Sequence, residues 1–255
     1  MTRTLIAGHR GGAELWPENS MMGFRAAARM PLDFVEFDIH LSGDGRLVVH
    51  HDATLDRMTD RSGAIMDLAW PDIAEAAIRG AAGERPPLLD EVIEVFRPTG
   101  IDLRMEIKLN AAQAPYPEIE AMAAAALDAA GMLERTAVSA FSLDTLARFR
   151  TAATPGRGMI WLLAPPTLRH VGDVAGAVAL MRHFGISEVA PRAPDITEER
   201  VAEFRAAGVR CGAYAVNDRA TIGRMLDLGL CAFTTDRPDL ALASRDALAG
   251  ERERA

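Results

Sequence analysis

The chain has 255 residues, of which 49% are hydrophobic and 25% charged, as is typical of a globular protein with a sizeable core. Its formal net charge of −8 argues against nucleic acid as a partner, because a surface that binds a phosphate backbone normally carries a basic excess. Charged residues interrupt its apolar stretches well before they reach the length that spans a bilayer, so we expect no stable membrane insertion.

The start of the chain and its cysteines predict a cytoplasmic location. The first strand-like run begins within five residues of Met1, so we expect no secretory leader. Cys211 and Cys231 lie in unlike segments and lack the spacing of metal ligands, and we interpret them as buried thiols. The sequence leaves a homo-oligomer open.

Strand-like runs alternate with helical stretches along the whole chain, without a long linker. Short apolar runs predict strands at residues 5–7, 34–39, 103–107, 136–140, 159–163, 188–190, 210–215 and 232–235. Apolar periodicity and end signals predict helices at residues 20–30, 89–96, 116–130, 143–150, 175–184, 197–207 and 219–228. Asn19 or Ser20 can cap the first helix.

About eight strand and helix units in about 250 residues predict an α/β fold, with a single (β/α)8 TIM-type barrel over residues 1–255. An open, doubly wound sheet is the alternative. Residues 41–85 fall outside the regular alternation, and we expect them to form an insertion after the second strand. Within it, Asp44-Gly45 predicts a hairpin, after which the chain returns to His51.

Two acidic residues, Glu36 and Asp38, interrupt an apolar strand-like run. Because side chains on a strand alternate, both carboxylates leave the backbone on one side, whereas Val35, Phe37 and Ile39 face the other. Burying two like charges costs several kcal/mol per ion unless a cation compensates, so a divalent metal is the natural explanation. An edge strand with one wet face is the alternative.

Other strand-like runs also end in polar residues. The first ends at His9 and Arg10 in a glycine-rich turn, and the run at 103–107 places Glu106 and Lys108 on one face. In a barrel the carboxyl ends of the strands converge on one mouth, so these groups are expected to gather there. Polar residues at further strand ends are Asp38, Tyr214 and Asp236.

The order of these motifs resembles that of the glycerophosphodiester phosphodiesterases, over nearly the whole chain. The matching motifs are His9-Arg10-Gly11, Pro17-Glu18-Asn19-Ser20, Glu36-x-Asp38, Asp44-Gly45-x-x-Val48-Val49-x-His51-Asp52, Leu55-x-Arg57-x-Thr59, Glu106-Ile107-Lys108 and Thr235-Asp236-x-Pro238. Three positions depart from the family pattern: Ser20, Met58 and Tyr214, which stands where a tryptophan is usual. The last departure concerns the substrate pocket rather than the chemistry.

Taken with this resemblance, the residues predict one metal site and its surroundings. Glu36, Asp38 and Glu106 are hard oxygen donors and would hold one Mg²⁺ or Ca²⁺. For Glu106, a salt bridge to Lys108 or Arg104 is the alternative. The other expected roles are acid–base catalysis by His9 and His51, phosphate binding by Arg10 and Lys108, and a possible substrate pocket of Glu18, Trp16 and Tyr214.

The resemblance implies metal-dependent hydrolysis of a glycerophosphodiester to glycerol 3-phosphate and an alcohol, within lipid or glycerol metabolism. One histidine would deprotonate the nucleophile and the other would protonate the departing alkoxide, but the spacing does not say which does which. Two alternatives stay open. A lysophospholipid phosphodiesterase would use the same site, and a catalytically silent phosphoester-binding protein would need a broken residue set.

Overall fold

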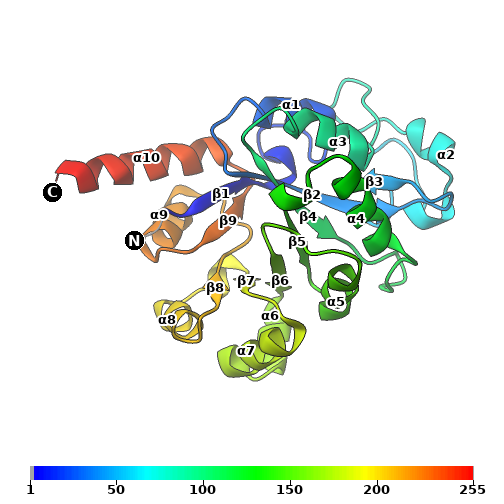
Figure 1. Ribbon diagram of the computed structural model, residues 1–255. Helices are drawn as coiled ribbons and strands as arrows, with labels where there is room; N and C mark the ends of the chain where they lie inside the picture. Colours follow the sequence, from blue (N-terminus) through cyan, green and yellow to red (C-terminus); the bar gives the residue numbers. More distant parts are fainter. Residues whose placement is uncertain (1–2, 255) are drawn as a thin grey trace.

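Eight parallel strands curve into a barrel in the computed structural model, which describes residues 3–254 (Figure 1). The strands are β1 (Leu5–Gly8), β2 (Phe34–Leu41), β4 (Asp102–Ile107), β5 (Thr136–Ala140), β6 (Met159–Leu163), β7 (Glu188–Pro191), β8 (Arg210–Cys211) and β9 (Ala232–Thr235). They follow the order β8-β7-β6-β5-β4-β2-β1-β9. Ala213 closes the ring, since its amide donates to the Ala232 carbonyl and its carbonyl accepts from Thr234. The predicted (β/α)8 barrel is confirmed.

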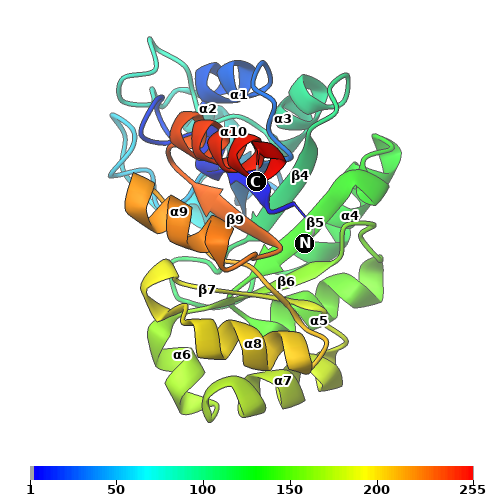
Figure 2. The ribbon, with the colours of Figure 1, turned by 90° about the vertical axis from the view of Figure 1, so that its left-hand side faces the viewer.

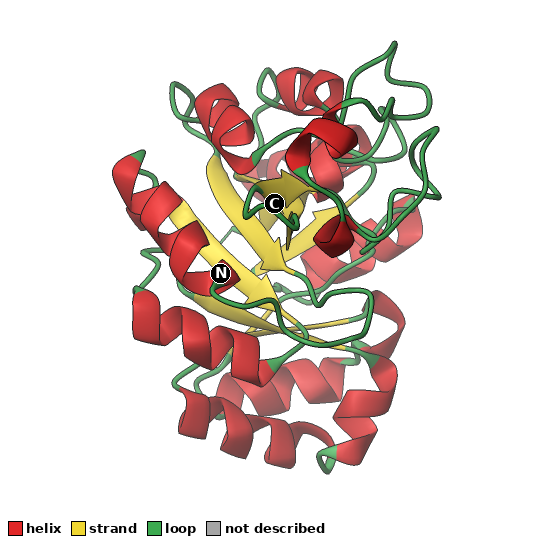
Figure 3. Cartoon of the chain, turned by 90° about the vertical axis from the view of Figure 1, so that its right-hand side faces the viewer, coloured by secondary structure: helices red, strands yellow, loops and turns green. Residues whose placement is uncertain are grey.

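Helices surround the strands on the outside of the barrel (Figures 2 and 3). They are α1 (Met21–Ala27), α2 (Trp70–Ala74), α3 (Leu89–Phe96), α4 (Ile119–Ala129), α5 (Leu143–Ala152), α6 (Pro165–His170), α7 (Asp173–Phe184), α8 (Glu198–Ala206), α9 (Arg219–Asp227) and α10 (Pro238–Arg254). The sequence did not predict α2, α6 or α10. Within residues 3–254, none of these helices is both long enough and apolar enough to cross a bilayer.

The alternation of β2 decides which of its side chains reach the site. Val35, Phe37 and Ile39 belong to the core cluster between the strands and the helices. Phe34 instead belongs to a smaller cluster with Ala7, Ile160 and Leu162. Since Glu36 shares the phase of Phe34, both acids of this strand point to the barrel interior.

The chain between β2 and α3 contains the predicted hairpin. Strand β3 (Leu47–Val49) pairs antiparallel with the end of β2, so that Val49 lies opposite Ile39. Gly45 takes a φ of 81° in the connecting turn, a conformation that glycine adopts without strain. This hairpin carries the chain back to the barrel mouth just before His51.

One expectation from the sequence needs correction, and one open alternative is decided. The strand predicted at 210–215 ends at Cys211, and beyond it only isolated bridges at Ala213 and Tyr214 continue the pairing. Ser20, rather than Asn19, caps α1, because the Ser20 hydroxyl accepts from the Gly23 amide. Asn19 has a φ of 52° and turns its side chain toward the site.

Candidate active site

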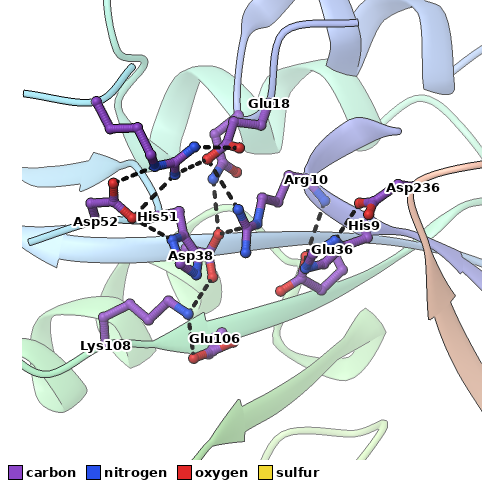
Figure 4. A network of polar contacts seen from close by, with 12 residues as sticks. His9, Arg10, Glu18, Glu36, Asp38, His51, Asp52, Glu106, Lys108 and Asp236 are labelled. Carbon is purple, nitrogen blue, oxygen red and sulfur yellow. Dashed lines mark hydrogen bonds and ion pairs between the residues drawn. The ribbon is translucent and has the colours of Figure 1, made fainter. Parts of the chain in front are cut away.

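Three carboxylates from β2 and β4 meet in the barrel interior (Figure 4). Oxygen atoms of Glu36, Asp38 and Glu106 lie within 4.8 Å of one another. The three residues are 3%, 0% and 5% exposed, respectively. Uncompensated carboxylates buried this close together would repel strongly, so the cluster requires positive charge.

Two cations contact this cluster. The Lys108 ammonium lies 2.9 Å from Asp38 Oδ1 and 2.6 Å from Glu106 Oε1. The Arg10 guanidinium lies 3.5 Å from Asp38, and the Arg10 backbone amide donates to Glu36. The salt bridge of Glu106 to Lys108 that the sequence left as an alternative is therefore present, and it coexists with the acid cluster.

The protonation of the cluster reflects its charge excess. Burial and the neighbouring Asp38 carboxylate raise the pKa of Glu36 to about 7. Burial also raises the pKa of Glu106. Burial opposes ionisation of Asp38 as well, but Lys108 and Arg10 outweigh it and hold the pKa of Asp38 well below its usual range. Two cations do not fully neutralise three acids, so the cluster still favours the binding of further positive charge.

Each of the two expected catalytic histidines is held at Nδ1 by a carboxylate. His9 Nδ1 lies 2.5 Å from Asp236, and His51 Nδ1 lies 2.6 Å from Asp52. A carboxylate only accepts, so each Nδ1 carries a proton and each Nε2 is left for other partners. His9 Nε2 lies 3.9 Å from Glu36.

The two imidazoles have opposite pKa shifts. Burial disfavours the charged form of His9, but Glu36 and Asp236 outweigh it and raise the pKa of His9. For His51, burial dominates and lowers the pKa. The two rings therefore differ in the ease with which each takes up a proton.

A second layer of ion pairs supports this arrangement. Glu18 accepts from Arg10 at 3.1 Å and from Arg57 at 2.6 Å. Arg57 also donates to Asp52, the partner of His51. The amide of Asn19 donates to Asp38 at 2.9 Å. Glu18 thus supports Arg10 rather than lining the hollow described next.

A hollow of about 220 Å³ lies above the acid cluster and contains both histidines, Arg10 and Lys108. A groove of about 400 Å³ adjoins it on the side of His51. Tyr214 lines the hollow, and its ring meets Phe141 edge to face at 5.7 Å. Trp16 is half-buried near Gly12 and lines neither space.

The residues present fit a divalent cation. Hard carboxylate oxygens are the ligands that Mg²⁺ and Ca²⁺ prefer. The high pKa of Glu36 and the buried position of all three acids indicate that two cationic side chains do not fully compensate the cluster. Glu36, Asp38 and Glu106 are the residues that would hold the ion.

The sequence indicated the residues of the site more completely than the contacts between them. Asp236 was expected at the mouth, but its contact with His9 joins residues 227 positions apart. The contact of Asn19 with Asp38 and the place of Phe141 beside Tyr214 were not predicted. No local spacing encodes these contacts, since they depend on how the barrel closes.

Carboxylates, cations and imidazoles gathered at one barrel mouth suit the hydrolysis of a phosphate ester. The sequence model of the "Glycerophosphoryl diester phosphodiesterase family" matches residues 9–240. The chain belongs to this family and is a phosphoric diester hydrolase.

Individual relatives agree with this assignment. A Mycobacterium tuberculosis protein assigned as glycerophosphodiester phosphodiesterase 2 is 30% identical, over 91% of this chain and 87% of that protein. A solved Agrobacterium tumefaciens structure assigned as a glycerophosphoryl diester phosphodiesterase is 36% identical, with a TM-score of 0.94 over 97% of this chain and 99% of that chain. An Oleispira antarctica phosphodiesterase, solved with its product sn-glycerol-3-phosphate, has a TM-score of 0.78 over 96% of this chain and 97% of that chain. At 23% identity, this likeness concerns the fold.

Proposed function

We propose that this protein hydrolyses glycerophosphodiesters to glycerol 3-phosphate and an alcohol in a metal-dependent reaction. The observation that carries the proposal is the single hollow lined by two acids of the cluster, both histidines and both cations. The product found in the Oleispira antarctica phosphodiesterase is consistent with it.

The proposed cofactor is one Mg²⁺ or Ca²⁺ held by Glu36, Asp38 and Glu106. A divalent ion at such a site polarises a phosphoryl oxygen and offsets the negative charge that develops during hydrolysis. Arg10 and Lys108 serve the same phosphate from the protein side. Arginine offers a fork of donors to two oxygens, and lysine offers a compact charge.

We assign proton transfer to His9 and His51. Each presents Nε2 while a carboxylate holds its Nδ1, so each ring is oriented and each has one nitrogen to accept or donate a proton. One ring takes the proton of the nucleophile, which is water or a glycerol hydroxyl. The other delivers a proton to the departing alkoxide.

A water-soluble diester is favoured over a lysophospholipid. The groove beside the hollow combines polar residues such as His51, Lys108 and Gln113 with the apolar residues Ile107, Leu109 and Phe141. Phe141, at 42%, is the one exposed large hydrophobic residue among those described. An acyl chain would require a broader apolar surface to leave water.

The test is an assay of the metal-free protein with glycerophosphocholine and with lysophosphatidylcholine, before and after addition of Mg²⁺ or Ca²⁺. We expect release of glycerol 3-phosphate from the first substrate only when an ion is present. Cleavage of lysophosphatidylcholine alone would favour a lysophospholipid phosphodiesterase. No ion-dependent cleavage of either would favour a silent phosphoester-binding protein.

A further inference from the structure

We propose that His40 and Tyr116 form a buried hydrogen-bond relay that fixes the backbone of His51, and that both act as positioning residues in turnover. The proposal rests on the catalytic role proposed for His51. Neither residue had a predicted role, since His40 lies outside the matching motifs and Tyr116 lies in the connection between β4 and α4.

The relay consists of two contacts on one imidazole. His40 Nδ1 lies 2.8 Å from Tyr116 Oη, and His40 Nε2 lies 3.1 Å from the carbonyl oxygen of His51. The rings of His40 and Tyr116 also meet edge to face, with centroids 5.7 Å apart. His40 is 1% and Tyr116 is 2% exposed, so water does not compete for these contacts.

The chemistry of the groups fixes the direction of both hydrogen bonds. The His51 carbonyl can only accept, so His40 Nε2 carries the proton. A neutral imidazole has one N–H, and therefore Nδ1 accepts from the Tyr116 hydroxyl. No carboxylate contacts the His40 ring in the part of the chain that the structure describes.

The His51 carbonyl depends on this contact. Across residues 3–254, no backbone amide donates to it. Asp52 holds the His51 ring at Nδ1, whereas His40 holds the peptide from which that ring extends. Because His40 lies two residues beyond Asp38 on β2, the relay ties the position of His51 to the strand that carries the acid cluster.

Loss of the relay should therefore misplace His51 without removing it. A displacement of about 1 Å at a catalytic group can lower a rate by up to about 100-fold. Substrate binding through Arg10 and Lys108, and ion binding through the acid cluster, should change little. The relay should thus affect kcat rather than KM.

The sharpest test compares His40→Gln with His40→Asn. The amide nitrogen of glutamine is as many bonds from Cα as His40 Nε2, so it can still donate to the His51 carbonyl. The asparagine amide reaches only the position of Nδ1. With glycerophosphocholine and a saturating ion, we expect His40→Asn to lose about 10-fold or more in kcat and His40→Gln to retain most of it.

Two further variants separate positioning from stability. Tyr116→Phe removes only the hydroxyl at the far end of the relay and should lower kcat by about threefold, with KM within about twofold. Thr136→Val removes an equally buried hydroxyl, which donates to the Met132 carbonyl at the opposite end of the barrel. It should lower the melting temperature and leave kcat unchanged.

Equal kcat values for the glutamine and asparagine variants would overturn the relay. So would a His40→Asn variant in which only KM or ion affinity changed and kcat did not. If the wild-type protein cleaved no glycerophosphodiester, the proposed function would fall. The relay would then be judged by the ¹⁵N resonances of the His51 imidazole. These resonances should shift in His40→Asn and stay in place in His40→Gln. Identical spectra for the two variants would contradict the relay.

Discussion

At the scale of single residues, the proposed mechanism separates proton transfer from ion binding. His9 and His51 contact acids at Nδ1 and are not part of the acid cluster. We therefore expect His9→Ala and His51→Ala each to lower kcat by about 100-fold or more, with ion affinity nearly intact. Glu36→Ala should weaken both ion binding and turnover. Ion titration and steady-state kinetics on the same preparations check this division.

Full turnover in His51→Ala would show that the mechanism with two histidines is wrong. Loss of ion affinity in either histidine variant would show that ion binding by the acid cluster depends on the histidines. His170→Ala is a suitable control, because His170 is exposed on α6 and lines neither the hollow nor the groove.

His40 also predicts a pH dependence of stability. Burial lowers the pKa of His40 to about 4 from an ordinary value of 6.5. Between these pH values His40 is protonated in the unfolded chain but stays neutral in the folded chain. The free energy of unfolding therefore falls as the pH drops from about 6.5 to about 4. The shift corresponds to roughly 3 kcal/mol.

Urea unfolding of the metal-free protein across this range measures that dependence. His40→Gln should show a shallower loss of unfolding free energy than the wild type, whereas His170→Gln should follow the wild type. Parallel curves for all three proteins would contradict a buried neutral His40.

At the scale of elements, the short helix η1 (His9–Gly11) carries two site residues through a strained turn. Arg10 has a φ of 51° and Gly11 a φ of 83°. A Cβ on Gly11 would lie 3.2 Å from Phe24 and from the backbone of Gly23. Gly11→Ala should therefore combine backbone strain with a packing clash, at a cost of roughly 2–4 kcal/mol.

Gly131→Ala is the matched control for this turn. Gly131 has a φ of 67°, and its added Cβ would meet nothing within 4 Å. It should show only the backbone cost, about 1 kcal/mol. Chemical denaturation compares the two variants, and equal costs would show that packing around Gly11 is looser than described.

Local pattern predicted most elements of the barrel and failed where their ends depend on tertiary contacts. The run at 34–39 was recognisable because its apolar residues alternate with acids. Strand β8 shortens to Arg210–Cys211, since closure against β9 depends on isolated bridges. Helix α10 was missed because its charged and small residues give little apolar periodicity, and it extends away from the strands (Figure 1).

For the site too, local pattern predicted which side chains share a face but not the contacts that depend on tertiary structure. Strand alternation placed Glu36 and Asp38 on one face, and the parallel register lays Asp38 beside Glu106. The partners of His9 and His40 were not predictable from spacing. Asp236 directly follows the last strand and Tyr116 lies in a loop, and both reach their histidines only after the barrel has formed.

At the scale of the whole molecule, a buried ion pair crosses the barrel interior beneath the site. Arg104 on β4 donates to Glu188 on β7 at 3.0 Å, with side chains 2% and 7% exposed. Arg104 lies between the site hollow and a second hollow of about 560 Å³ at the amino-terminal ends of the strands. Arg210, half exposed there, also contacts Glu188.

Arg104→Met should destabilise the protein by about 3 kcal/mol, because it leaves the buried Glu188 with only its outer partner. Arg104→Met combined with Glu188→Met should recover most of this loss. A double-mutant cycle of urea unfolding measures the coupling. Additive costs would show that the pair contributes nothing specific to the barrel.

The proposed function depends most on one divalent ion binding to three carboxylates. Anomalous diffraction from crystals soaked in Mn²⁺ tests this directly, with a Glu106→Gln crystal as the matched control. We predict a single peak in the wild type, coordinated by Glu36, Asp38 and Glu106, that weakens or disappears in the variant. A peak elsewhere in the molecule, or none at this cluster, would contradict the account.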